Sequence, residues 1–197
     1  NVRHDLIDIR RSALVLVDYQ QRLMPALHRG TEALAAAARL AMVAQELGVP
    51  VIGTEQNPRG LGPNAPEVAG RCATTLAKVH FDACADGLVN AIRDHPKRTQ
   101  IVISGCEAHV CVLQTAVSLL RAGFSVWIVS SSTSSHSQID RARAFERLQT
   151  LGATVVSLEM VLFEWLARGD HPRFRDVLQL IKAHRSCGKQ AKNYLRK

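Results

Sequence analysis

Long apolar runs are absent from this sequence of 197 residues. None approaches the roughly 20 residues that a membrane-spanning helix needs, although apolar residues make up 47% of the chain and charged residues 21%. The opening stretch, NVRHDLIDIRRS, also contains no apolar segment of the kind found in a secretory signal peptide. These absences argue against a membrane protein and favour a cytoplasmic one, and the length suits one domain with a sizeable core.

Paired cysteines are missing as well. The five cysteines are odd in number and irregularly spaced, and no CxxC pair occurs among them. A disulfide framework is therefore not expected, and the cysteine usage favours reduced thiols in a cytosolic setting. The sequence also contains no internal repeat.

Acidic residues are missing from residues 182–197, which contain six basic ones. The formal net charge of the chain is +8, so subtracting six leaves +2 for the other 181 residues. A basic chain end can bind polyanions, but it is more often a solvated terminus. We therefore expect no nucleic-acid partner, a single domain over residues 1–182, and a basic C-terminal tail over residues 183–197.

Short apolar runs rich in β-branched residues recur along the chain. Each is apolar throughout, as is typical of strands buried on both faces of a parallel sheet. The predicted strands are Ala13–Val17, Val49–Gly53, Gln100–Ser104, Ser125–Val129 and Thr154–Val156, with a weaker candidate at Ala77–His80.

Helical patterns lie between these runs, at Thr31–Leu47, Cys84–Asp94, Val110–Ala122 and Ser137–Leu151. Thr31 and Ser137 are the expected N-caps of their helices. Alternating strands and helices predict an α/β fold of three layers, doubly wound, with a mostly parallel central sheet. Ligands of such folds bind beyond the carboxyl ends of the strands.

Charged side chains follow two of the predicted strands and lie within a third. Asp18 comes directly after ALVLV, Glu55 lies in the TEQ that follows VPVIG, and Lys78 lies within LAKVHF. Each has an ordinary alternative, since Asp is common in loops and caps and a lysine in an apolar stretch usually extends to solvent. A partly buried Asp18 could instead act as a general base, with Lys78 beside it.

Two cysteines follow the strand IVIS, in the stretch GCEAHVC. Cys111 falls at the start of a predicted helix, where the helix dipole and free N–H groups would lower the thiol pKa and could hold an oxyanion. Cys106 lies at the strand–loop junction, where a buried structural thiol is the commoner state. If Asp18, Lys78 and Cys111 converge, they suit acyl transfer through a thioester.

At these residues the sequence resembles the isochorismatase-like cysteine hydrolases, and its closest branch looks like the isochorismatase-domain-containing proteins. The matching segments, which cover most of the chain, are LVLVDYQ, VPVIGTEQNPRGLGPNAPEV, KVHF, GCEAHVCVLQTA, SSSTSSHSQIDRARAFERL and HPRFRDVLQLIK. The resemblance implies that Asp18 is the general base, Lys78 the positioning cation and Cys111 the nucleophile of a hydrolase acting on C–N bonds of small amides.

The same resemblance implies further features of the site. The peptide bond between Cys106 and Glu107 is expected to be cis, and the backbone N–H groups of Glu107 and Cys111 are expected to form an oxyanion hole. The residues expected to bind the small-molecule substrate are Gln20, Glu55, Phe81 and His109.

Metal ligands found in nicotinamidases after the second strand are missing here, because TEQNPRGLGPNAPEV contains neither His nor Asp. We therefore expect no catalytic metal and no cofactor, and we expect no nicotinamidase activity. Isochorismatase itself lacks the nucleophilic cysteine in the family picture, so the presence of Cys111 argues against that reaction.

Other interpretations stay open at this point. The chain could be a binding or scaffold protein that keeps the hydrolase fold without turnover, or a thiol–redox protein that uses Cys106 and Cys111. The resemblance also implies a homo-oligomer. Large apolar residues after Leu158, among them Phe163, Trp165, Leu166 and Phe174, could cover either the sheet or a neighbouring subunit.

Overall fold

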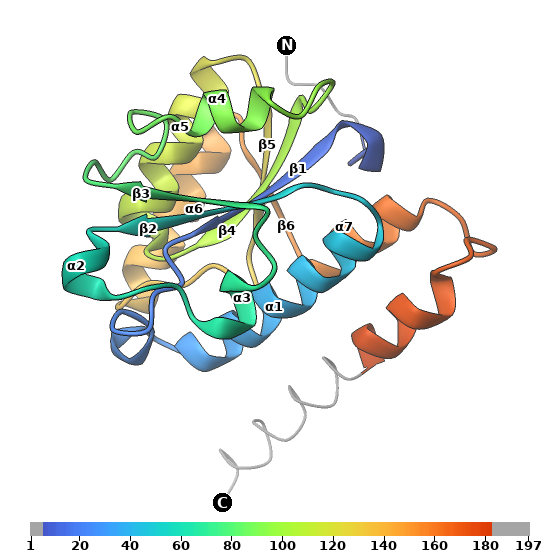
Figure 1. Ribbon diagram of the computed structural model, residues 1–197, viewed down its shortest axis with the longest axis horizontal. Helices are drawn as coiled ribbons and strands as arrows, with labels where there is room; N and C mark the ends of the chain where they lie inside the picture. The colour runs from blue at the N-terminus through green and yellow to red at the C-terminus, as the bar shows by residue number, and fades with distance from the viewer. Residues whose placement is uncertain (1–5, 183–197) are drawn as a thin grey trace, which may run out of the picture.

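The computed structural model describes residues 6–182, so the predicted basic tail at 183–197 lies outside the described residues. Within that range six strands form one sheet in the order β3-β2-β1-β4-β5-β6, and every neighbouring pair is parallel (Figure 1). The strands are β1 (Ser12–Val17), β2 (Val51–Gln56), β3 (Thr74–Lys78), β4 (Gln100–Gly105), β5 (Ser125–Val129) and β6 (Thr154–Val156). The predicted parallel α/β sheet is confirmed, and its strand order changes direction between β1 and β4, where ligand sites of such folds lie.

Helices cover both faces of the sheet (Figure 1). One face carries α1 (Gly30–Glu46) and α7 (Leu158–Leu166), and the other carries α4 (Leu88–Arg93), α5 (Leu113–Arg121) and α6 (Gln138–Thr150). The shorter elements are η1 (Ile9–Arg11), η2 (Met24–Ala26), α2 (Pro58–Leu61), α3 (Pro66–Ala69) and the π-turn η3 (Ala108–Val112), and a final helix spans residues 174–182. None of the helices within residues 6–182 is both long and apolar enough to cross a membrane.

The strands divide the core into two apolar clusters. Successive side chains of a strand point to opposite faces, so Leu14 and Leu16 of β1 join the cluster under α1 and α7. Ala13, Val15 and Val17 of the same strand join the cluster under α4, α5 and α6. This double burial explains why β1 is apolar at nearly every position and why it cannot shift in register without exposing one cluster.

Two predicted element boundaries are wrong at the N-terminal side of a helix. Arg29, in a left-handed conformation with φ 52°, occupies the N-cap position of α1, and the helix begins at Gly30 rather than after a Thr31 cap. The Met24 carbonyl packs where a side chain on Gly30 would lie. The helix predicted from Cys84 begins only at Leu88, because Gly87 at φ 99° breaks the preceding turns.

Ser137 does cap α6, as predicted, by accepting a hydrogen bond from the backbone N–H of Asp140. The second strand is also placed differently from the prediction of Val49–Gly53. It runs to Gln56, because the register of β2 against β3 pairs Glu55 with Ala77 and Gln56 with Lys78. Three polar residues beyond the predicted end of the strand therefore belong to it.

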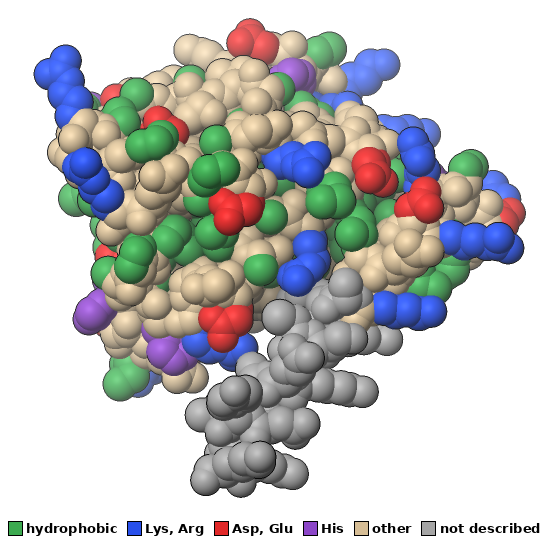
Figure 2. Space-filling view, turned by 60° about the horizontal axis from the view of Figure 1, so that its bottom comes forward, with side chains coloured by type: hydrophobic (Ala, Val, Ile, Leu, Met, Phe, Trp, Pro, Cys, Tyr) green, Lys and Arg blue, Asp and Glu red, His purple; other side chains and the backbone are tan. Residues whose placement is uncertain are grey.

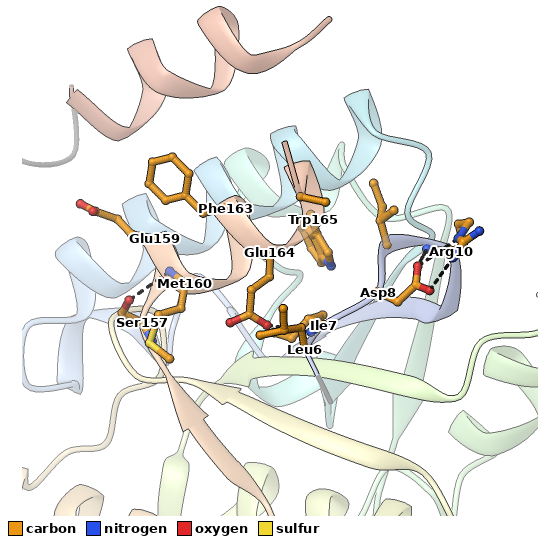
Figure 3. A pocket seen from close by; sticks show the side chains of 12 residues that line it. Leu6, Ile7, Asp8, Arg10, Ser157, Glu159, Met160, Phe163, Glu164 and Trp165 are labelled. Atoms are coloured by element: carbon orange, nitrogen blue, oxygen red, sulfur yellow. Dashed lines mark hydrogen bonds and ion pairs between the residues drawn. The ribbon is translucent and has the colours of Figure 1, made fainter. Parts of the chain in front are cut away.

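The segment after Leu158 divides between the interior and the surface. Trp165 and Leu166 are buried and pack within the subunit, whereas Phe163 is 39% exposed. Phe163 lines a hollow of about 870 Å³ between residues 6–10 and α7, together with exposed Leu6 and Met160 (Figure 3). The face shown in Figure 2 intersperses acidic and basic side chains, in keeping with the near balance of charge outside the tail.

Candidate active site

The carboxyl ends of β1 and β4 meet unusually closely. Gly105 ends β4 at φ 154°, and a side chain there would collide with the carbonyl oxygen of Val17. Only glycine permits this approach, and the next residue, Cys106, donates its N–H to the same Val17 oxygen at 2.9 Å. Asp18 then leaves β1 in a left-handed conformation with φ 54°. The crowded backbone thus brings the residues that follow both strands together.

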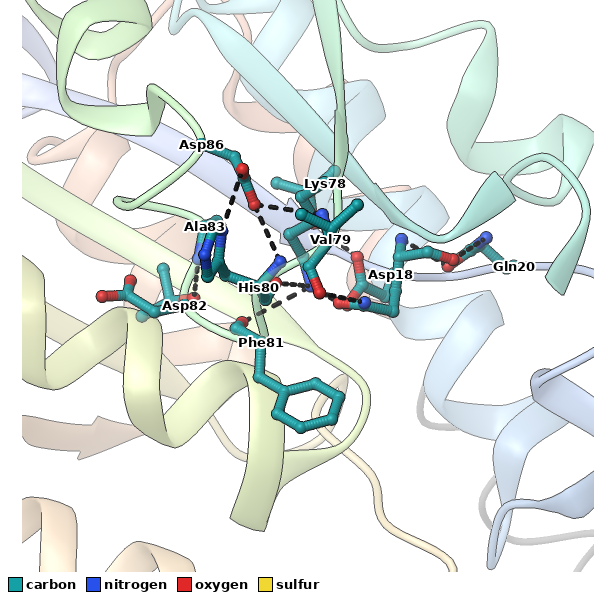
Figure 4. A network of polar contacts seen from close by, with 12 residues as sticks. Asp18, Gln20, Lys78, Val79, His80, Phe81, Asp82, Ala83 and Asp86 are labelled. Atoms are coloured by element: carbon teal, nitrogen blue, oxygen red, sulfur yellow. Dashed lines mark hydrogen bonds and ion pairs between the residues drawn. The ribbon is translucent and has the colours of Figure 1, made fainter. Parts of the chain in front are cut away.

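Asp18 and Lys78 form a buried ion pair (Figure 4). The Lys78 Nζ lies 2.8 Å from Asp18 Oδ2, and both side chains have 0% exposure to solvent. Two charges can be buried together when each neutralises the other and hydrogen bonds satisfy the remaining atoms. Lys78 therefore does not extend to solvent, which was the ordinary alternative for a lysine in an apolar stretch.

The two carboxylate oxygens of Asp18 have different surroundings. Oδ1 accepts a hydrogen bond of 2.6 Å from the hydroxyl of Thr54, which is buried on β2. Oδ2 forms the ion pair with Lys78, and within residues 6–182 it accepts no hydrogen bond of good geometry. Oδ2 is therefore the oxygen with room to accept a proton.

Lys78 has three further acceptors around its ammonium group. The nearest is Oε1 of Gln56 at 2.6 Å, followed by the carbonyl oxygens of His80 at 3.3 Å and Phe81 at 3.4 Å. Figure 4 shows Lys78 between Asp18, which follows β1, and the loop of His80 and Phe81 that follows β3. The ammonium group is held on several sides, so its position is fixed by the fold rather than by solvent.

Cys111 lies in the π-turn η3 that leads into α5, and it is 6% exposed. Its thiol interacts with both Asp18 and Lys78, so the structure brings the three predicted catalytic residues together. The pKa of the thiol is raised to about 12, mainly by burial and then by the Asp18 carboxylate, against the opposing effect of Lys78. The expected lowering of this pKa at a helix terminus is wrong, because desolvation and a nearby anion both favour the neutral thiol.

The peptide bond between Cys106 and Glu107 is cis. Cys106 itself is fully buried, with its sulfur 3.9 Å from that of Met24, and burial raises the pKa of its thiol. The Glu107 side chain accepts a hydrogen bond of 2.7 Å from the backbone N–H of His136, which ties the start of η3 to the loop after β5.

The other predicted site residues lie at the same end of the sheet but differ in how far their side chains are buried and hydrogen-bonded. Gln20 is fully buried, and its amide donates to the carbonyl oxygens of Gln56 and Gly62 while accepting from the N–H of Gln56. Gln20 thus supports the ends of the neighbouring segments. Glu55 accepts a hydrogen bond from the N–H of Asn64, which fixes the loop between α2 and α3.

Phe81 is exposed and His109 is partly buried. Phe81 is 51% exposed and points away from the polar network while its carbonyl faces Lys78 (Figure 4). His109, two residues before Cys111, places its Nδ1 at 3.0 Å from the hydroxyl of buried Ser135. Within residues 6–182 no three His, Cys, Asp or Glu side chains gather in a way that could hold a metal ion.

Residues 12–160 match the family model of the isochorismatase domain. This chain belongs to the isochorismatase family. Among similar family members, isochorismatase domain-containing protein 2 of Xenopus laevis is 34% identical over 172 residues, which are 87% of this chain and 84% of that protein. The residues matched by the family model include Asp18, Lys78 and Cys111.

Solved structures of the isochorismatase fold agree with this assignment. The MAR1 ribonuclease from Caenorhabditis elegans superposes with a TM-score of 0.85 at 32% identity, covering 90% of this chain and 92% of that one. The YcaC gene product from Escherichia coli, described as an octameric hydrolase of unknown specificity, gives a TM-score of 0.86 at 22% identity, covering 97% and 98%. The second likeness shows the fold alone.

Two residues of the site are missing from the sequence prediction of catalytic and binding groups. Thr54 contacts Asp18 and Gln56 contacts Lys78, and both lie on β2. Their strand register places Thr54 beside Val17 and Gln56 beside Lys78. The TEQ motif was the available signal, but its polar residues indicated a loop, so their side-chain contacts could not be inferred.

Proposed function

We propose that this member of the isochorismatase family is a cysteine hydrolase that cleaves the C–N bond of a small amide or related acyl substrate. One observation supports the proposal above all: a buried Asp18–Lys78 ion pair interacts electrostatically with the thiol of Cys111. A buried charge pair is costly to maintain for stability alone, whereas a nucleophile, a base and a cation in contact are the parts that acyl transfer needs.

The first half of the proposed reaction forms a thioester. As the substrate enters, the Cys111 thiol gives its proton to Asp18 Oδ2, and the sulfur attacks the carbonyl carbon. The N–H groups of Glu107 and Cys111 are proposed to hold the resulting oxyanion, and Lys78 balances the negative charge of the site. The C–N bond then breaks, and protonated Asp18 gives its proton to the departing nitrogen.

The second half consumes water. Asp18 takes a proton from a water molecule, whose oxygen attacks the thioester carbon. The C–S bond breaks, the carboxylic acid product leaves, and the proton on Asp18 returns to the Cys111 sulfur. The raised pKa of the resting thiol, about 12, fits this scheme because the same Asp18 that holds the thiol neutral receives its proton.

Substrate recognition is assigned to the more accessible side chains. We propose that Phe81 and His109 contact the substrate. Glu55, near the end of β2, is proposed as a further substrate contact. Gln20 keeps this edge in place through its backbone contacts.

The test is a screen of small primary and secondary amides for release of ammonia or amine, followed by intact mass of the protein. Wild type should release product and, when quenched early, carry an acyl adduct that maps to Cys111. Cys111→Ala should lower the rate at least about a thousandfold, as expected for a nucleophile whose removal ends covalent catalysis. Cys72→Ala is the matched control, because Cys72 is a free, partly exposed thiol that lies beside α3.

Two other outcomes would contradict the proposal. A protein that binds small amides without turning any over would be a binding or scaffold protein on the hydrolase fold. The likeness to a chain named MAR1 ribonuclease calls for a parallel arm with a single-stranded RNA substrate. RNA cleavage that survives Cys111→Ala would replace the amide hydrolase with a different chemistry.

We further propose that the chain forms homo-oligomers, like the octameric YcaC protein. The apolar side chains of Leu6, Met160 and Phe163, which are 75%, 46% and 39% exposed, are the surface proposed for the contact. Light scattering of wild type and Phe163→Glu measures this directly, and an assembly that is unchanged by the substitution would place the interface elsewhere.

A further inference from the structure

Gln56 makes the shortest contact to the Lys78 ammonium, closer than Asp18 itself. Its Oε1 lies 2.6 Å from Lys78 Nζ, compared with 2.8 Å for Asp18 Oδ2. An ammonium has three N–H groups and accepts nothing, and these two contacts are clearly shorter than those to the carbonyls of His80 and Phe81. Gln56 and Asp18 together therefore set where the N–H groups of Lys78 point.

The Gln56 amide can adopt only one orientation in this setting. Its Nε2 donates to the carbonyl oxygen of Val79 at 2.8 Å, while its Oε1 accepts from Lys78. A carbonyl only accepts and an ammonium only donates, so rotating the amide by half a turn would put two acceptors and two donors face to face. The chemistry of the two partners thus fixes Oε1 toward Lys78.

The backbone of Gln56 is held equally firmly. Its N–H and carbonyl are both bonded to the side chain of Gln20, at 2.8 Å and 3.0 Å. The strand register pairs Gln56 with Lys78 across β2 and β3, which places their side chains on the same face. The contact to Lys78 is therefore built into the sheet and does not depend on a mobile side chain.

The Gln56 amide is uncharged, and this matters for the charge balance around Lys78. Among the groups that contact Lys78 Nζ within residues 6–182, only Asp18 carries a charge. A carboxylate in place of Gln56 would compete with Asp18 for the ammonium and leave the buried site with an excess negative charge. An apolar side chain would satisfy neither Lys78 nor the Val79 carbonyl.

We propose that Gln56 is a positioning residue that keeps the Lys78 ammonium directed at Asp18 and Cys111, so that it controls the reactivity of the Cys111 thiol. The inference rests on the proposed function, in which Cys111 is the nucleophile. It predicts that Gln56 acts only through Lys78, because Gln56 contacts neither Asp18 nor Cys111 by any hydrogen bond found within residues 6–182.

The experiment measures the rate at which iodoacetamide alkylates Cys111, with intact mass and peptide mapping to identify the site, so it needs no substrate. Gln56→Met should lower the rate at pH 7.5 about fivefold in the presence of Lys78. In the Lys78→Met background the same change should alter the rate less than about twofold, because residues that act through one another are not additive.

Gln56→Glu gives an independent arm. An added carboxylate beside Lys78 should shift the thiol titration upward by about one unit, seen as roughly tenfold slower alkylation at every pH from 6.5 to 9. Gln149→Glu, on the exposed surface of α6, is the matched control for the added charge and should match wild type. Near-UV circular dichroism of each variant verifies that the fold is retained.

The outcomes separate this inference from the proposed function. Wild-type alkylation rates in both folded Gln56 variants, or a fivefold effect of Gln56→Met that persists without Lys78, would overturn the role of Gln56. Rates that follow the prediction while no amide is hydrolysed would support Gln56 as a positioning residue and contradict the hydrolase.

Discussion

Two ion pairs of this protein have the same length and opposite surroundings. Asp18 and Lys78 approach to 2.8 Å with both side chains at 0% exposure. Arg143 and Glu146 on α6 also approach to 2.8 Å, with side chains 75% and 62% exposed. Distance alone therefore says little about what a charge pair does. Water screens the surface pair and hydrates each charge when the pair breaks. In the buried pair, a charge that loses its partner has no water to take the partner's place.

The largest expected effect comes from removing one member of the buried pair. Lys78→Met leaves the Asp18 carboxylate without its counter-ion in a site closed to water. Breaking a buried pair in this way costs about 3–5 kcal/mol, so we expect the free energy of unfolding to fall by that amount. Urea denaturation followed by circular dichroism measures it, and a loss below about 1 kcal/mol would mean that water reaches Asp18.

The double variant Asp18→Asn, Lys78→Met sharpens the same comparison. It removes both charges, so much of the stability lost in Lys78→Met should return. A double variant that is as unstable as the single one would show that packing around the lysine stem, rather than its charge, stabilises the site.

The hydrogen bond of 2.6 Å from Thr54 to Asp18 should rank next. Thr54→Val keeps the shape of the side chain and removes the donor to a buried charged oxygen. Hydrogen bonds to charged groups contribute about 1.5–3 kcal/mol, so we expect a loss of about 2 kcal/mol in urea denaturation. Thr150→Val is the matched control, because the Thr150 hydroxyl donates to a backbone carbonyl on the exposed surface of α6. Equal losses in the two variants would contradict a special role for burial.

Much of the fold and the central residues of the site are accessible to sequence reasoning. The apolar runs before Asp18 and Cys106 predict buried parallel strands, and their carboxyl ends predict where the site lies. The extent of β2 is not accessible, because Thr54, Glu55 and Gln56 are polar and become a strand only through pairing with β1 and β3. The residues adjacent to these three in the sequence carry no information about such pairing.

The sequence prediction is wrong about the direction in which the pKa of Cys111 shifts. The helix-terminus argument considers only local sequence and predicts a lowered value. Burial depends on residues far away in the chain, and so does the position of Asp18, which follows β1 whereas Cys111 follows β4. In this fold the distant effects outweigh the local one, and the pKa is raised to about 12.

The pH dependence of Cys111 follows from that raised pKa. Well below a pKa of about 12 the thiolate fraction grows tenfold per pH unit, so alkylation should accelerate about tenfold per unit from pH 6.5 to 9 without a plateau. Asp18→Asn removes an anion that raises this pKa. It should speed alkylation about tenfold at pH 7.5 while abolishing amide hydrolysis. A plateau below pH 8 in wild type would instead show a preformed thiolate.

The smallest effect is expected at the surface pair. Arg143→Ala breaks a contact of the same length as the buried one, but Glu146 simply regains its hydration shell. We expect the free energy of unfolding to change by less than about 0.5 kcal/mol, and alkylation of Cys111 to be unchanged. The value should fall further with added salt, because exposed charges are screened within roughly 10 Å at 0.1 M. A loss comparable with that of Lys78→Met would mean that proximity, and not burial, decides what an ion pair contributes to this fold.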